Sequence, residues 1–272
     1  MHKMQPRNLG AARPLVADLP HYLSVHAVLD GTCPGEAYVD DPADPQATFV
    51  VTPEGHYVIG RPDGEAFLAW LSGHVRGKLA AGRAAGWRYA CFRFSPDGWR
   101  EPLGRILAPF APTADYQNYL VCRKARPDWR EGVPAGFEMR PIDRALLDEA
   151  GLANHGRVAG WAKGNFGSAE GFLAHGFGFC LLHGQAIASW CLADCVSGER
   201  CEIGIHTAPG FRRRGLATLT AAAAVEHALS RGLTRIGWHC WSANVASAAT
   251  AHEVGFKKEL EHPGFVMVFG GR

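Results

Sequence analysis

The chain has 272 residues, which is enough for one large domain or for two small ones with separate cores. Its hydrophobic fraction of 47% and charged fraction of 20% are typical of a globular enzyme, and its net charge of +2 lacks the basic excess of most nucleic-acid binders. No apolar run is long enough to span a membrane, and the first residues lack the apolar core and cleavage site of a secretory signal. We therefore expect a cytoplasmic protein that binds neither nucleic acid nor a membrane.

The first half of the chain predicts short strands around one long helix. Three prolines and little periodicity indicate a loosely structured lead-in over residues 5–20. β-Branched and aromatic runs with turn-rich segments between them predict strands at residues 36–39, 47–52 and 56–59. Apolar residues at helical spacing, followed by Gly86, predict a helix over residues 65–85. A strand at 87–94, a short helix at 99–107 and a strand at 116–122 complete this half.

A linker separates this half from a second one. Residues 125–136 are charged, rich in proline and glycine, and without periodicity, so we place the division between residues 1–130 and 131–272. Strands are then predicted at 137–141, 179–183, 186–192, 201–208, 235–241 and 265–269, and helices at 144–154, 168–175, 215–230 and 245–253. The similar order of elements on both sides of the linker predicts an α/β (α+β) tandem of two related halves.

Eight cysteines are scattered through apolar, strand-like stretches of both halves. They are Cys33, Cys91, Cys122, Cys180, Cys191, Cys195, Cys201 and Cys240. None belongs to a CxxC pair or has a histidine at metal-ligand spacing, so buried reduced thiols are favoured over disulfides or a zinc site. We expect no bound metal.

The most informative segment is EIGIHTAPGFRRRGLAT, residues 202–218, in which a strand leads through a basic loop into a long helix. The start of a helix carries backbone N–H groups without partners and a partial positive charge, and these favour an anion such as a diphosphate. Gly215 and Ala217 allow a ligand close to the backbone. The loop adds three cationic side chains, those of Arg212, Arg213 and Arg214. The alternative is an ordinary strand-turn-helix with a solvated basic turn.

A second segment, NVASAATAHEVGF, follows one strand later and begins at Asn244. Together the two segments resemble the GNAT acetyltransferase superfamily, in which the pattern (Q/R)xxGx(G/A) starts a long helix and a later Asn opens a helix that closes in "GF". Residues 212–217, RRRGLA, match the first pattern, and Asn244 with Gly255-Phe256 matches the second. The resemblance covers about residues 137–269.

The resemblance implies the GNAT fold, a mixed central sheet flanked by helices, with a degenerate GNAT-like half at 1–130 and a catalytic domain at 131–272. The match of the first half rests on element order alone. A narrower likeness is to the zwittermicin-resistance-type GNAT acetyltransferases, which have a long first half, an EIGI-x-T strand, an RRGLAT-like loop and an N-x-x-S helix. Residues 36–51 also resemble the start of that first half.

The resemblance further implies acetyl-CoA as cosubstrate and a set of residues that bind it. Backbone groups of the strand would pair with the pantetheine arm, N–H groups of residues 213–218 would hold the diphosphate, and strands 201–208 and 235–241 would splay around the thioester. Asn244 would bond to the pantetheine or the thiol region. The expected cofactor-binding residues are Ile205, His206, Thr207, Arg212, Arg213, Arg214, Gly215, Leu216, Ala217, Thr218, Asn244 and Ser247.

Transfer of an acetyl group to an amine needs a base, a donor for the developing oxyanion and a route for the leaving thiolate. Glu202 is the preferred base because it alternates with Gly204 and His206 onto one face of a strand beside the thioester. A surface or salt-bridged carboxylate is the equal alternative. His206 is favoured as a packing group, and the backbone N–H groups of residues 205–207 are the natural oxyanion donors.

One departure from the family pattern concerns the general acid. Many GNAT enzymes carry a tyrosine seven residues after the Asn, whereas this chain has Ala251 there. Ser247 opens the same helix and is a second catalytic candidate, at the sulfur, although a purely structural role at the helix start is favoured. Protonation of the thiolate thus falls to Ser247, to water or to no group at all.

The implied activity is transfer of acetyl from acetyl-CoA to a primary amine of a small molecule, such as an amino-sugar, an amine antibiotic or an amino acid. The glycine-rich residues 155–172, with Trp161 and Phe166, are either a lid over the acceptor or a plain helix-helix loop. A non-catalytic acyl-CoA sensor is the main alternative. A Rossmann-type nucleotide binder is disfavoured because the GxGxxG spacing is missing. A homodimer is left open.

Overall fold

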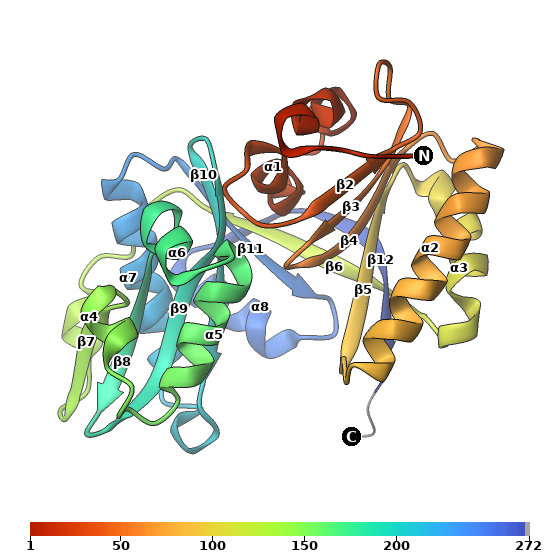
Figure 1. Cartoon of the computed structure of the whole chain (residues 1–272). Helices are drawn as coiled ribbons and strands as arrows, with labels where there is room; N and C mark the ends of the chain where they lie inside the picture. Colours follow the sequence, from red (N-terminus) through yellow and green to blue (C-terminus); the bar gives the residue numbers. More distant parts are fainter. Residues whose placement is uncertain (270–272) are drawn as a thin grey trace. The chain divides into compact units, whose positions relative to one another are not determined.

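The structure, a computed structural model, describes residues 1–269 of the chain (Figure 1). Two units are distinguished by their internal packing. Unit 1 contains Met1–Gly31, Gly35–Gln117 and the described chain from Glu261 onward, and unit 2 contains Thr32–Pro34 and Asn118–Leu260.

Unit 1 is built on a mixed sheet with the strand order β1-β2-β3-β4-β5-β12. Its strands are β1 (His2–Lys3), β2 (Glu36–Val39), β3 (Ala47–Thr52), β4 (Gly55–Gly60), β5 (Tyr89–Ser95) and the end of β12 (Lys257–Val268). β4 and β5 are parallel, and the other neighbours are antiparallel. The α-helices are α1 (Leu23–Asp30), α2 (Glu65–Ala84) and α3 (Arg100–Leu107), with 3-10 turns at Pro6–Val16, Asp97–Trp99 and Ala108–Phe110.

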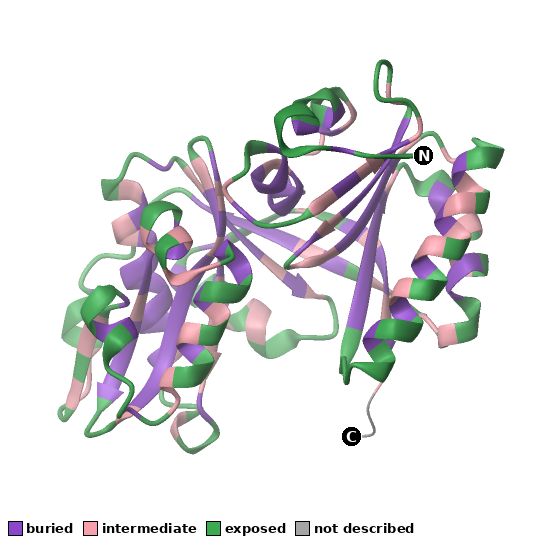
Figure 2. Ribbon diagram, in the orientation of Figure 1, coloured by how far each residue is buried: buried purple, intermediate pink, exposed green. Residues whose placement is uncertain are grey.

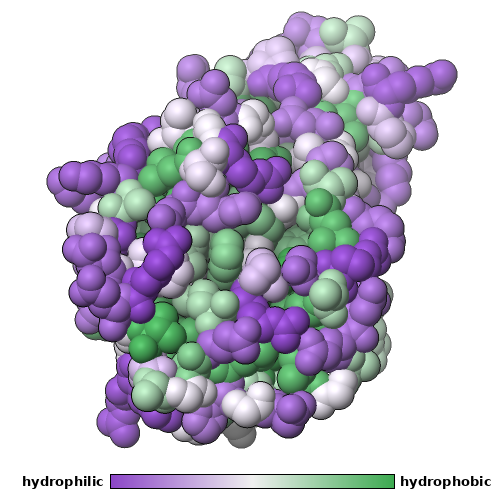
Figure 3. Space-filling view, turned by 90° about the vertical axis from the view of Figure 1, so that its left-hand side faces the viewer, coloured by the Kyte–Doolittle hydropathy of each residue, from purple (hydrophilic) through white to green (hydrophobic). Residues whose placement is uncertain are grey.

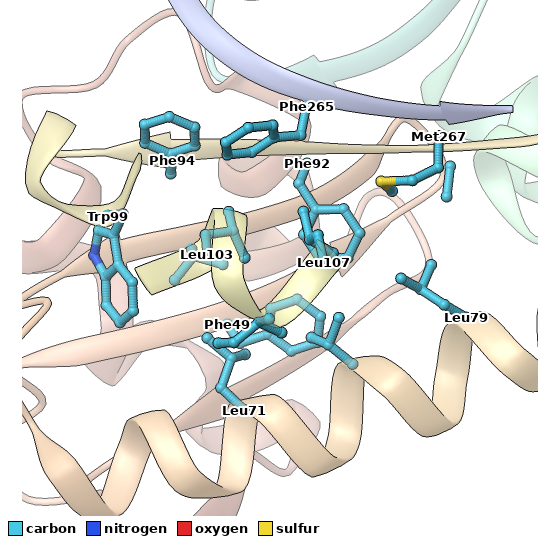
Figure 4. Packing of buried hydrophobic residues seen from close by; sticks show 14 of the residues in the cluster. Phe49, Leu71, Leu79, Phe92, Phe94, Trp99, Leu103, Leu107, Phe265 and Met267 are labelled. Carbon is cyan, nitrogen blue, oxygen red and sulfur yellow. The ribbon is translucent and has the colours of Figure 1, made fainter. Parts of the chain in front are cut away.

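The core of unit 1 lies between the sheet and one stripe of α2. Phe67, Leu71, Val75 and Leu79 recur every four residues, and all four are buried. They pack in one cluster with sheet residues and with α3, as Figure 4 shows for Leu71, which lies below Phe49. Figure 2 shows buried residues recurring between exposed and intermediate ones along α2. The helix predicted at 65–85 is thus confirmed, and its apolar face is buried against the sheet.

Unit 2 is also a mixed sheet, with the order β6-β11-β10-β9-β8-β7. Its strands are the end of β6 (Thr113–Cys122), β7 (Phe137–Pro141), β8 (Gly178–His183), β9 (Ala186–Ser197), β10 (Arg200–Thr207) and β11 (Arg235–Trp241). β7 to β10 are antiparallel, and β10 and β11 are parallel. The α-helices are α4 (Arg144–Asp148), α5 (His155–Phe166), α6 (Ala169–His175), α7 (Leu216–Ser230) and α8 (Val245–Val254), with 3-10 turns at Trp129–Gly132 and Pro209–Phe211.

Opposite faces of the unit 2 sheet carry different helices. On β9, Ser189 Oγ lies 3.4 Å from Thr220 Oγ1 of α7, whereas the next residue, Trp190, lies under the Arg157 guanidinium of α5. Because successive side chains of a strand point to opposite faces, α7 and α5 cover opposite faces of this sheet. In Figure 1 the two helices accordingly lie on either side of β9.

The predicted fold class, a mixed sheet flanked by helices, is confirmed in each unit. Both units also repeat one topology: four antiparallel strands, a crossover helix and a parallel strand. These elements are β1 to β4, α2 and β5 in unit 1, and β7 to β10, α7 and β11 in unit 2.

The observed units differ from the expected division at residues 130 and 131. Unit 1 takes its last strand from the end of the chain, because Gly264–Val268 of β12 pairs antiparallel with Tyr89–Arg93 of β5. Unit 2 begins before the linker, with the end of β6 next to β11. Thr32 joins unit 2 because its hydroxyl donates to Val196 O at 2.7 Å.

Three local expectations were wrong. The lead-in is a 3-10 helix whose Leu9, Ala12 and Val16 are buried, so tertiary packing orders it despite its prolines. The helix expected at 144–154 ends at Asp148. The plain helix-helix loop that was one alternative for residues 155–172 is excluded over 155–166, which form the regular helix α5 with Val158, Ala162 and Phe166 buried.

Two further expectations concern cysteines and the surface. All eight cysteines are free and buried, which confirms the expected reduced thiols. No helix within residues 1–269 combines the length and apolar character that crossing a membrane requires. Figure 3 shows hydrophilic side chains spread across the visible face with hydrophobic ones between them.

Candidate functional site

The two parallel strands of unit 2 separate partway along their length. Among the described residues, β10 and β11 pair from Arg200 with Arg235 to Glu202 with Gly237. β10 continues from there to Thr207 and β11 to Trp241 without further pairing to each other. The expected divergence is therefore present, and it leaves the β10 backbone from Ile203 onward open on its β11 side.

The loop after β10 presents a row of free backbone N–H groups. Gly215 precedes α7 with φ of 72°, and Arg213 also lies in the left-handed region, at 59°. For an arginine that conformation is uncommon and is typical of functional sites. Across the part of the chain that the structure describes, the N–H groups of residues 213–218 have no hydrogen-bond acceptor. With the dipole of a 15-residue helix behind them, these amides are suited to hold an anion.

A cavity of about 590 Å³ lies between this loop, the end of β10 and the start of α8. Every predicted cofactor-binding residue except Arg214 lines it. These residues are Ile205, His206, Thr207, Arg212, Arg213, Gly215, Leu216, Ala217, Thr218, Asn244 and Ser247. The structure thus brings together, around one hollow, two segments that are well separated in the sequence. Phe211, Ala246, Thr250 and Glu253 also line the cavity and were not predicted.

The three arginines of the loop have different surroundings. Arg212 lines the cavity, and its Nε donates to Thr207 O at 3.2 Å. Arg213 also lines the cavity and is exposed. The Arg214 guanidinium instead lies 5.0 Å from the centre of the Phe137 ring on β7. Arg214 can therefore contribute its backbone N–H to the anion site while its side chain packs outside the cavity.

Glu202 is a buried carboxylate at the point where the strands diverge. It is 6% exposed, and its Oε2 lies 3.3 Å from His239 Nδ1 on β11. Its side chain crosses Gly237, where a Cβ would come within 2.8 Å of Glu202 Cγ. The alternative of a surface carboxylate is excluded for Glu202, because its side chain is buried beside His239. It does not line the cavity.

Tyr119, from β6, completes the surroundings of this carboxylate. Its ring lies 4.8 Å from that of His239, and burial, followed by the negative charge of Glu202, raises the pKa of Tyr119 to about 12. Arg235 Nε lies 3.4 Å from the Tyr119 hydroxyl. Sequence reasoning missed Tyr119 because no motif marks β6 as a neighbour of β11.

His206 is an imidazole on the cavity wall. Its ring lies 4.6 Å from that of Trp190, which supports the expected packing role. Burial, followed by the charges of Arg157 and Arg212, lowers the pKa of His206. Its Nε2 is shielded from solvent and makes no hydrogen bond within the described chain.

Asn244 and Ser247 form the start of α8. Asn244 Oδ1 accepts a hydrogen bond from Ser247 N at 3.1 Å and so caps the helix. Ser247 Oγ accepts from Trp238 Nε1 at 3.0 Å. Both side chains therefore have structural bonds while lining the cavity. Ala251, at the usual tyrosine position, is fully buried.

Glu253 is an acidic group on an otherwise basic wall. Its Oε2 accepts a hydrogen bond from Thr218 Oγ1 at 2.8 Å, which ties α8 to the first turn of α7. No sequence pattern singled it out, since a glutamate late in a helix is ordinarily a solvated residue. Among residues 1–269, no group of three or more histidine, cysteine and acidic side chains is placed to hold a metal.

Both units have one mixed-sheet topology, and in unit 2 the parallel pair diverges next to backbone N–H groups at a helix start; this combination is typical of acyltransferases of the GNAT class. The chain belongs to the GNAT acetyltransferase family, whose description matches residues 13–265. The resemblance read from residues 202–218 and 244–256 is confirmed at this level.

Known relatives agree with this assignment. The chain is 26% identical over 239 residues to the uncharacterized N-acetyltransferase YdfB of Bacillus subtilis (strain 168), covering 88% of this chain and 87% of that protein. In fold it is similar to a GCN5-related N-acetyltransferase-like protein from Streptococcus suis 89/1591, with a TM-score of 0.71, 20% identity, and coverage of 95% and 98%. It is also similar to a tandem GNAT protein from the clavulanic acid biosynthesis pathway, with a TM-score of 0.57, 12% identity, and coverage of 99% and 98%. The tandem GNAT fold is thereby confirmed.

Proposed function

We propose that this protein transfers an acetyl group from acetyl-CoA to a primary amine of a small molecule. The observation that carries the proposal is the row of unpartnered backbone N–H groups at residues 213–218 on the wall of a 590 Å³ cavity. Such a row at a helix start binds a diphosphate better than any neutral group. The residues present therefore fit coenzyme A, and proteins of the GNAT fold use acetyl-CoA.

The unpaired edge of β10 supports the placing of the pantetheine arm. Backbone groups of residues 205–207 would hydrogen-bond to its amides as another strand would, and Arg212 and Arg213 would add charge at the diphosphate. Asn244 and Ser247 lie across the cavity at the start of α8. We assign Ser247 to the region of the thiol, where its hydroxyl is held by Trp238.

Catalysis requires a neutral amine whose nitrogen bonds to the thioester carbonyl carbon as the carbon–sulfur bond breaks. When bound, acetyl-CoA supplies the activated acetyl group. The amine loses one proton and the departing thiolate gains one, so the overall reaction releases amide and thiol without a further reactant. We assign the base to Glu202, paired with His239 at the start of the divergence, with water relaying the proton because the carboxylate lies outside the cavity.

The first half is proposed to be a degenerate copy without a cofactor site. In unit 1, β4 and β5 do not diverge. They pair from His56 with Phe92 to Ile59 with Ser95, and Ser95 is the last residue of β5. Trp99, fully buried at the start of α3, donates its Nε1–H to Gly60 O at 2.8 Å. The indole is therefore bonded to the end of β4, the strand whose counterpart in unit 2 is β10.

A non-catalytic acyl-CoA sensor is the second candidate function. The observation that favours it is Ala251, which is buried where many relatives carry the tyrosine acid. The finer likeness to zwittermicin-resistance-type enzymes, a cytoplasmic location and a homodimer remain predictions.

Two measurements on the purified full chain separate these functions. Calorimetry with acetyl-CoA tests the cofactor site, and absence of binding would reject both functions. Release of free thiol from acetyl-CoA is then followed with glucosamine, tyramine and lysine as acceptors. Turnover with any of them supports the transferase, and binding without turnover across a broad amine panel supports the sensor.

A further inference from the structure

Arg157 is an exposed cation at the third position of α5, on the helix that covers one face of the unit 2 sheet. Within residues 1–269 its guanidinium makes no hydrogen bond and no ion pair. It lies 5.8 Å from the centre of the Trp190 ring on β9. Arg144 of α4, by contrast, is paired with Glu170 at 3.1 Å. The charge of Arg157 is therefore not used inside the protein.

The rings next to Arg157 carry two polar nitrogens that the protein leaves without a partner. Trp190 and His206 are opposite each other on β9 and β10, and their ring centres lie 4.6 Å apart. Trp190 Nε1 and His206 Nε2 are shielded from solvent and make no hydrogen bond within the described chain. Because buried polar side-chain atoms usually have a partner, two such atoms side by side indicate a place where a polar molecule binds.

This place borders the cavity of unit 2 and has a positive charge on two sides. His206 and Arg212 both line the cavity, whereas Arg157 lies on the α5 side. The two guanidinium groups act on the same imidazole, since burial and then the charges of Arg157 and Arg212 lower the pKa of His206. The cavity wall at the end of β10 is therefore cationic.

The acidic groups nearest to it along β9 and β10 are bonded within the protein. Asp194 Oδ1 accepts hydrogen bonds from Trp161 Nε1 and Asn165 Nδ2, both on α5, at 2.7 Å. Glu202 Oε2 lies 3.3 Å from His239 Nδ1. Both carboxylates thus have partners in unit 2, while the guanidinium at the start of α5 has none. The ligand that this combination favours is an anion.

A positive wall also suits the chemistry of acetyl transfer. The amine attacks only in its neutral form, and nearby positive charges lower the pKa of an ammonium group, so they favour that form. A carboxylate elsewhere on the same molecule would be attracted to the wall, and a guanidinium matches its geometry with two parallel N–H donors. His206 belongs to the segment proposed to pair with the pantetheine arm, so an acceptor bound here lies beside the thioester.

We infer that the acceptor is a primary amine that also carries a carboxylate, an amino acid being the simplest case, and that Arg157 binds this carboxylate. The rings of Trp190 and His206 form the adjoining surface. The transfer step is unchanged, because the carboxylate is held and takes no part in the bonds that form and break. The inference rests on the proposed acetyltransferase function and narrows its acceptor from any small amine to one with an acidic group.

The test uses two pairs of amines that differ only in the carboxylate, tyrosine with tyramine and lysine with cadaverine. Thiol release is measured at saturating acetyl-CoA. In the wild type we expect kcat/KM to be about tenfold or more higher for the member with the carboxylate, as for gain of a charge-assisted hydrogen bond. Arg157→Gln should remove this preference by raising KM for that member alone, with the Kd for acetyl-CoA unchanged.

Lys163→Gln is the matched control, since it removes one positive charge from an exposed position of the same helix. It should keep the wild-type preference. An unchanged Kd for acetyl-CoA in Arg157→Gln shows that the variant is folded; if it does not fold, the wild-type comparison of the two pairs decides alone.

Three results would count against parts of this reasoning in different ways. If the wild type acts on both members of each pair equally well, or prefers the amines without a carboxylate, the inference is wrong and the proposed function stands. The same holds if Arg157→Gln slows both members of a pair alike, or if glucosamine is acetylated and no amino acid is. A wild type that does not bind acetyl-CoA, or binds it without thiol release from any amine, rejects the transferase function and the inference with it.

Discussion

Replacement of Gly215 by valine tests the anion site most directly. Gly215 has φ of 72°, which a β-branched residue adopts only at a cost of about 1–3 kcal/mol. The surrounding space is open, since nothing lies within 4 Å of an added Cβ. The valine is thus expected to shift the loop without a clash in the core, and the fold should survive.

The expected change in the Kd for acetyl-CoA depends on how many backbone N–H groups of the loop are displaced. If the shift removes one or two hydrogen bonds from the loop to a charged diphosphate, at about 1.5 kcal/mol each, the Kd for acetyl-CoA rises about tenfold to a hundredfold. Isothermal calorimetry measures the Kd, and thermal denaturation reports the stability.

Gly232 provides a matched control at the other end of the same helix. Its φ is 82° and its surroundings are equally open, so Gly232→Val imposes a similar strain away from the cavity. Both variants should lose similar stability, and only Gly215→Val should lose affinity. If both variants bind acetyl-CoA like wild type, or if both weaken binding equally, the reasoning about the loop fails.

Three further outcomes are expected. Glu202→Gln should lower kcat at least about tenfold and alter the pH–rate profile with little change in the Kd for acetyl-CoA; a wild-type profile would place the base elsewhere. Arg212→Ala should weaken acetyl-CoA binding in calorimetry, whereas Arg214→Ala should not, because its guanidinium packs on Phe137; equal losses would contradict the observed orientations. His56, whose pKa is lowered from 6.5 to about 4 chiefly by burial, binds its proton more readily in the unfolded chain, so stability falls by up to about 3 kcal/mol as the pH drops from 6.5 to 4. Denaturant titrations at several pH values give the free energy of unfolding as a function of pH. Between pH 6.5 and 4 this free energy should fall less in His56→Phe than in the wild type, and an equal fall would assign the acid sensitivity to other groups.

The parts of the fold that could be predicted from the sequence are those that depend on local pattern. The apolar stripe of α2 predicted its length to within one residue, and residues 202–218 predicted a strand, a turn and the start of α7. Hydrophobic periodicity and the pattern of arginines and glycine before a helix start involve only a few neighbouring positions, so they are visible in a single sequence.

The remaining features depend on contacts between distant segments. Glycines at residues 156, 160 and 164 lower the helix propensity of α5, and only its packing on the sheet makes it a helix. β9 has a β-bulge at Asp194, since Glu202 pairs with Cys195 and the next residue, Ile203, pairs with Ala193. The bulge depends on the register of β9 against β10, and no residue type in β9 predicts it. The hydrogen bond from Trp99 to the end of β4 could not be predicted either, because its acceptor is a backbone carbonyl 39 residues earlier.

Because β12 pairs with β5, the sheet of unit 1 cannot be completed until the chain of unit 2 has also been synthesised. Five residues near the end of the chain, Gly264–Val268, provide the hydrogen-bonding neighbour of β5. During translation this side of β5 therefore stays open until β12 has been synthesised, and such edges invite pairing with other chains. A gene cut at the linker would give a first fragment with the same exposed edge. We expect that fragment to aggregate unless a peptide of the β12 sequence is supplied with it.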